Sequence, residues 1–147
     1  PKELGVGVSQ VIPLIAAACQ REKCVMVEQP EIHLHPKQQA ALADMLIENA
    51  KSNEDRFIVE THSEHLLQRI LRRIGQTASG KLPEEESAFQ LSLDDVGVYY
   101  VHSGEDDEES ASGAKLVPVE ISESGRMKQP WPDGFFSEGK EDVFWNV

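Results

Sequence analysis

Two short apolar runs in this sequence end in polar side chains of the kind that act on phosphate groups and metal ions. The first run, Val25–Val27, is followed by Glu28 and Glu31, and the second, Phe57–Val59, is followed by His62. In open α/β sheets, ligands bind at the carboxyl ends of the strands. One carboxylate there can hold Mg²⁺, a second can orient an attacking water, and a histidine can hydrogen-bond to a phosphate. The plainer alternative is a Pro turn with a surface glutamate, and a histidine that caps a helix.

A third candidate is the glycine-containing segment Gly5–Gln10, which leads into an expected helix. Backbone N–H groups at a helix start, the helix dipole and the hydroxyl of Ser9 can together bind an anion. The segment therefore predicts a phosphate contact, and an ordinary helix cap is the alternative.

The elements that must position these side chains alternate between helix and strand. Helical periodicity, N-caps and apolar runs predict the following order: helix 9–22, strand 23–28, helix 36–50, strand 56–60, and a helix that is capped by Ser63 and ends at Gly75. Both strands are apolar enough to be buried on both faces. This order predicts an α/β fold built on a right-handed parallel β-α-β unit with helices packed against the strands.

The second half of the chain differs from the first in composition and in expected secondary structure. Residues 75–95 are acidic and rich in turn formers, and we expect a poorly ordered linker there. Residues 96–101 and 115–121 predict an antiparallel hairpin with a solvated loop over 104–113, and Pro118 favours an edge strand. An aromatic tail follows. We therefore expect three parts: an α/β part over 1–74, the linker over 75–95, and a small β-rich appendage over 96–147.

The composition narrows the function classes. The formal net charge is −12, and residues 1–74, 75–113 and 114–147 carry −1, −9 and −2 of it. A nucleic-acid backbone would repel such a surface, so direct nucleic-acid binding is not expected. There is no apolar run of membrane length, so no membrane partner is expected either. With two cysteines, a reduced, cytoplasmic protein is the default. The first residue is Pro1, which suggests a piece of a longer protein.

Taken in order, these segments resemble the second half of an ABC-class ATPase head. Gly5–Gln10 resembles the signature loop, Val25–Glu28 the Walker B strand, and Thr61-His62 the switch histidine. The combination of residues 28–36 (EQPEIHLHP) with residues 60–63 (ETHS) resembles a branch of bacterial AAA-type ATPases. These are relatives of the overcoming-lysogenization-defect and structural-maintenance-of-chromosomes heads, and several serve in phage defence. Residues 131–138 resemble the C-terminal domain of unknown function attached to that branch.

The resemblance implies ATP and Mg²⁺ as ligands and gives each candidate residue a role. Glu28 would order Mg²⁺, Gln29 or Glu31 would position the attacking water, and His62 would sense the γ-phosphate. A second ATPase head would sandwich the nucleotide, and four residues of the signature loop would contact it in trans: Gly5, Gly7, Ser9 and Gln10. His35 stands where the family has its D-loop aspartate, at the contact between the heads.

One departure from the family pattern limits what this chain can do alone. The phosphate-binding motif Gly-x-x-x-x-Gly-Lys-Ser/Thr is absent from the sequence. The resemblance places that Walker A half upstream, as a partner of this segment. The fragment alone is therefore not expected to hydrolyse ATP. In the family, the dimerised heads control an associated effector, for example a nuclease.

Two other function classes compete with the ATPase interpretation. Four histidines could form a zinc cluster, since His-x-His pairs on loops can bind metal: His33, His35, His62 and His65. Alternatively, the acidic region over 75–113 could belong to a non-enzymatic domain that binds a basic partner. That interpretation leaves the strand-end residues unexplained.

Overall fold

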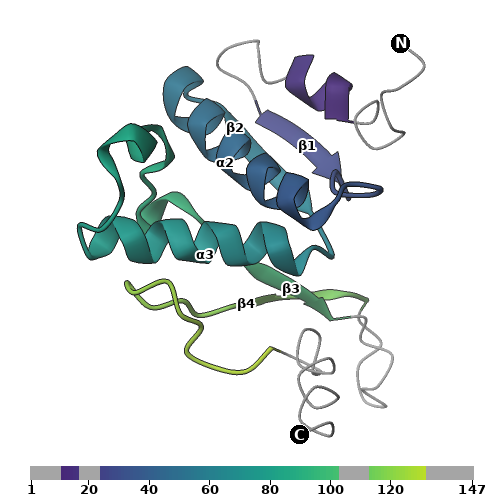
Figure 1. Cartoon of the computed structure of the whole chain (residues 1–147). Coiled ribbons are helices and arrows are strands. Elements are labelled where there is room, and N and C mark those ends of the chain that lie inside the picture. The colour runs from purple at the N-terminus through teal and green to yellow at the C-terminus, as the bar shows by residue number, and fades with distance from the viewer. Residues whose placement is uncertain (1–10, 17–23, 103–112, 132–147) are drawn as a thin grey trace, which may run out of the picture.

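The computed structural model of the chain describes residues 11–16, 24–102 and 113–131. Residues 11–16 are helical. Figure 1 shows the elements that follow, and their bounds are β1 (Cys24–Glu28), α2 (Pro36–Asn53), β2 (Arg56–Glu60), α3 (Glu64–Ala78), the 3₁₀ helices η1 (Glu84–Phe89) and η2 (Leu93–Asp95), β3 (Tyr99–His102) and β4 (Lys115–Pro118). The strands β1 and β2 pair in parallel, with Val25 opposite Phe57. The expected α/β fold, with a parallel strand pair between helices, is confirmed.

The turn into α2 is fixed by its first residues. His35 is the N-cap, and its Nδ1 accepts the amide N–H of Lys37 at 3.4 Å. The amide of His35 donates to Oε1 of Gln38 at 3.0 Å, which completes a capping box. Pro36 follows at the first helical position, where a missing N–H costs nothing. These contacts confirm the helix start that the sequence predicts.

The main core lies on one face of the strand pair. Four half-buried strand residues (Val25, Val27, Phe57 and Val59) pack against a buried apolar cluster whose members are Leu14, Leu34, Leu42, Ala43, Leu46 and Leu66. The opposite face is different, because Met26 is 76% exposed and Ile58 56% exposed. The expectation that both strands are buried on both faces is therefore wrong for the described part of the chain. The alternating exposure of β1 and β2 is that of a sheet covered on a single side.

The helix α3 runs past the glycine that was expected to end it. It begins at the N-cap Ser63, as predicted, but continues through Gly75 to Ala78, where Ser79 caps it. A Cβ at Gly75 would overlap the carbonyl oxygen of Ser124. Gly75 therefore allows close packing against the turn at residues 122–126. From the sequence alone, a glycine in this role cannot be distinguished from a glycine that ends a helix.

The matching glycine of this contact is Gly125, and it yields a stability prediction. Gly125 has a φ of +70°, and a Cβ there would overlap the carbonyl oxygen of Leu71 and lie 2.9 Å from the amide nitrogen of Gly75. We expect Gly125→Ala to lower the free energy of unfolding by roughly 2 kcal/mol, measured by urea denaturation. Gly113→Ala is the matched control, because a Cβ at Gly113 meets nothing within 4 Å. Equal midpoints for the two variants would contradict the close approach.

Residues 79–95 are more structured than the expected linker. They contain η1 and η2, and Leu91 is buried against Ile47 of α2 and Ile74 of α3. The expectation of a poorly ordered loop over 75–95 is wrong because apolar side chains within the acidic stretch join a second core cluster. The boundaries of the three parts remain a prediction.

A buried ion network also ties this region to the two helices. Arg73 is 0% exposed, and it donates from Nε to Oδ1 of Asp44 at 2.8 Å and from Nη2 to Oδ2 of Asp44 at 2.9 Å. Its Nη1 donates to Glu86 of η1, and the guanidinium lies 4.8 Å from the centroid of the Phe89 ring. The hydrogen bond to Asp44 raises the pKa of Arg73 above its ordinary value, and the hydrogen bond from Arg73 lowers the pKa of Glu86. Arg73 and Glu86 are therefore both held in their charged forms.

The predicted hairpin is present as β3 and β4. The two strands pair antiparallel, with Tyr100 opposite Val117, and Pro118 ends a strand that has no further partner in the described residues. Most of the loop expected over 104–113 lies outside the described residues. No helix in the described ranges is long and apolar enough to cross a membrane.

Candidate functional site

The carboxyl ends of β1 and β2 place two carboxylates side by side. Glu28 and Glu60 are the last residues of their strands and are partners in the parallel register, so their side chains share the uncovered face. Both residues are exposed. Two accessible carboxylates on adjacent strand ends can bind a divalent cation or hold a water.

The turn that follows β1 has an unusual backbone. The amide of Gln29 donates to the carbonyl of Glu60 at 2.7 Å, so the turn starts as an extension of the strand pairing. Gln29 (φ 43°) and His33 (φ 63°) are both left-handed, although neither is glycine. Such conformations cost of order 1 kcal/mol or more and gather at functional turns. The two strained residues bracket Glu31.

Glu31 connects this turn to the turn after β2. Its Oε1 accepts the backbone N–H of His62 at 2.8 Å, across 31 residues of sequence. Glu31 is only 7% exposed, and its Oε2 is buried with no hydrogen-bond partner among the described residues. Glu31, for which a surface position was the plainer alternative, is therefore a buried link between the two strand ends.

A glutamine that the sequence analysis missed supports the same pair of turns. Gln39, in the first turns of α2, donates from Nε2 to the carbonyl of Leu34 at 2.9 Å. Its Oε1 accepts the hydroxyl of Ser63 at 2.6 Å, and Oγ of Ser63 accepts the amide of Leu66 at 2.9 Å. The cap at Ser63 was expected, but its link to Gln39 depends on the packing of α2 against α3. The one signal in the sequence that could have pointed to Gln39 was its place as a polar residue on a helix face that is otherwise apolar.

The remaining predicted site residues are placed as follows. His35 is exposed and is the N-cap of α2, and its role between two heads stays a prediction. Gly5, Gly7, Ser9 and Gln10 lie outside the described residues. The four histidines His33, His35, His62 and His65 all lie within the described ranges, where no group of three or more His, Cys, Asp or Glu side chains could hold a metal ion. The structure gives the zinc cluster no support.

Comparison with known protein families supports the ATPase interpretation for the first part of the chain. Residues 2–67 match the AAA ATPase domain family. This part of the chain is an AAA ATPase domain fragment. Residues 91–144 match a second family, a domain of unknown function called DUF3696. No curated protein and no solved structure matches the chain.

An AAA ATPase domain implies ATP and Mg²⁺ as ligands, and the strand-end residues fit them. The exposed carboxylates of Glu28 and Glu60 are oxygen ligands of the kind that Mg²⁺ prefers. Glu31 lies in the adjoining turn, where its buried, unpartnered Oε2 is held at a cost to stability. The exposed pair Glu28 and Glu60 is therefore the feature of this edge that fits a divalent cation.

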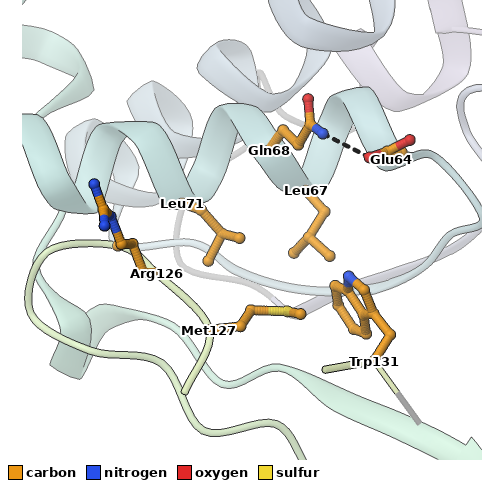
Figure 2. A pocket seen from close by; sticks show the side chains of 8 residues that line it. Glu64, Leu67, Gln68, Leu71, Arg126, Met127 and Trp131 are labelled. Atoms are coloured by element: carbon orange, nitrogen blue, oxygen red, sulfur yellow. Dashed lines mark hydrogen bonds between the residues drawn. The ribbon is translucent and has the colours of Figure 1, made fainter. Parts of the chain in front are cut away.

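A pocket elsewhere on the chain is distinct from this site. A pocket of about 250 Å³ lies between α3 and residues 125–131, and Figure 2 shows the side chains that line it. Leu67 and Leu71 of α3 point toward Met127 and Trp131, while Arg126 lies at its edge. None of the predicted site residues lines it, and the pocket instead marks the join between α3 and the DUF3696 region.

Proposed function

We propose that this chain is the C-terminal part of an ATP-hydrolysing, ABC-class head that acts as a dimer. The observation that carries the proposal is the hydrogen bond from His62 to Glu31, within a fragment that matches the AAA ATPase domain. This bond holds the turn after β1 against the turn after β2, so Glu28, Gln29 and His62 share one edge of the strand pair. Phosphoryl transfer depends mainly on such positioning and on charge stabilisation.

Each residue of this edge has a proposed task. Glu28 would hold Mg²⁺ at the end of β1, and Gln29 would orient an attacking water through its side-chain amide. The imidazole of His62 would donate a hydrogen bond to a phosphate oxygen. When bound, ATP would supply the electrophilic phosphorus and Mg²⁺ would neutralise charge on the phosphate oxygens. Glu31 is the other candidate for orienting the water, although its Oε1 accepts the amide of His62 and its Oε2 is shielded from solvent.

The proposed partners follow from the faces that the fragment leaves uncovered. Met26 and Ile58 form an exposed apolar patch on the outer face of the strands, and we propose that the Walker A half of the same head covers it. His35 and the residues 5–10 would meet a second head. We further propose that ATP turnover regulates an associated effector such as a nuclease, in antiviral defence, with residues 96–147 as the C-terminal appendage.

Isothermal titration of Mg²⁺-ATP tests the proposal directly. The 147-residue chain lacks the phosphate-binding motif, and we expect no micromolar binding to it. A longer protein that joins this chain to a Walker A half should bind Mg²⁺-ATP in the micromolar range and release phosphate. Failure of the longer protein to bind nucleotide would contradict the proposed function. Micromolar binding to the 147-residue chain would contradict the proposal that nucleotide binding needs the Walker A half.

A further inference from the structure

We propose that Glu31 is a positioning residue that fixes the backbone of His62, and that it is not the base that activates water. This inference rests on the proposed function and assigns the role of one residue within it. The starting observation is that a carboxylate, and not a backbone carbonyl, takes the amide N–H of His62.

The accessibility of the Glu31 carboxylate separates the two roles. A general base must reach the proton that it removes, either directly or through one water. Oε1 of Glu31 is occupied by the amide of His62, and Oε2 is shielded from solvent. Gln29 is more accessible than Glu31 and lies next to Glu28. In this geometry Glu31 faces the turn that it supports and not the exposed edge.

His62 needs such support because its neighbours are already anchored. On one side, the carbonyl of Glu60 accepts the amide of Gln29, and on the other, Ser63 is held by Gln39. His62 lies between them in the short connection from β2 to α3. The bond to Glu31 is the third anchor, and it fixes the peptide plane from which the imidazole projects. The left-handed conformations of Gln29 and His33 shape the turn that brings Glu31 to this position.

The choice of a carboxylate also fits a functional role. A glutamine could make the same Oε1 contact without leaving a charged oxygen buried, and an unpartnered buried oxygen is costly. A carboxylate acceptor makes a shorter and stronger bond to a backbone N–H than a neutral amide does. The gain is tighter control of the peptide that carries His62.

Hydrogen exchange at single amides, measured by NMR on the 147-residue chain, tests the inference. We expect Glu31→Ala to speed exchange of the His62 amide by roughly tenfold to a hundredfold relative to the Leu42 and Ala43 amides of the core. Glu31→Gln keeps an acceptor and should recover most of the protection. Glu48 is an exposed glutamate on α2, so Glu48→Ala is the matched control. It should leave the exchange rates of the His62 amide and of the two core amides unchanged. Equal acceleration at His62 and at the core, or none at His62, would overturn the inference.

Turnover in the longer ATPase gives the second measurement. We expect Glu31→Ala to lower kcat with little change in KM, and Glu31→Gln to restore a large part of kcat. If Glu31→Gln is as inactive as Glu31→Ala while its His62 amide stays protected, Glu31 is the base and the inference is wrong. The exchange measurement needs no nucleotide, so its failure is distinguishable from failure of the proposed function, which would appear as no turnover in the unmodified protein.

Discussion

Glu28→Gln and His62→Ala are each expected to lower ATP turnover of the longer ATPase by about 100-fold or more. Glu28→Gln removes the charge that would hold Mg²⁺, and His62→Ala removes the group that would donate a hydrogen bond to a phosphate oxygen. Loss of one preorganised electrostatic contact to a reacting group typically costs ~10²-fold or more in kcat. Steady-state phosphate release, with saturating Mg²⁺-ATP, measures the effect. Both residues are exposed at strand ends, so the fold should survive.

Matched controls separate this effect from a general loss of charge or imidazole. Glu48→Gln makes the same charge change on the exposed face of α2, and His65→Ala removes an exposed histidine three residues from His62. Both controls should retain turnover. Near-normal turnover in Glu28→Gln or His62→Ala would remove that residue from the site. Gln29→Ala, assayed beside Glu31→Gln, shows which side chain orients the water, because Glu31→Gln keeps an acceptor for the His62 amide.

The sequence was sufficient for β2 and for the starts of α2 and α3 because their determinants are local. The strand Arg56–Glu60 was predicted to the residue from its apolar run, and Ser63 and Pro36 marked the starts of two helices. A parallel pair followed from the intervening helix, since a connection of that kind favours parallel strands. The shared edge of Glu28 and His62 was a consequence of that topology.

The contacts that hold the edge together could not be predicted because they join distant residues. Nothing in the sequence distinguishes Glu31, which is buried, from a surface glutamate after a Pro turn. The link from Gln39 to Ser63 depends on how α2 packs against α3. Gly75 carries the pattern of a helix end, and only the approach of Ser124 explains its place inside α3.

Arg73 is the clearest case, and its replacement should have the largest effect on stability. In the sequence it stands beside Arg72 and looks like a second surface arginine, yet it is fully buried while Arg72 is exposed. We expect Arg73→Met to lower the free energy of unfolding by roughly 3 kcal/mol or more, because it leaves the largely buried carboxylate of Asp44 without its main partner. Urea denaturation of the 147-residue chain measures the change.

Arg72→Met is the matched control and should change stability little, since exposed charges contribute little. The acid dependence gives a second test. Arg73 lowers the pKa of Glu86, so this pair stabilises the fold above the ordinary glutamate pKa, and the contribution is lost as the pH falls through the lowered value. Arg73→Met should therefore lose less stability on acidification than the unmodified chain does. Equal stabilities of the Arg73 and Arg72 variants at neutral pH would show that the network does not tie η1 to the two helices.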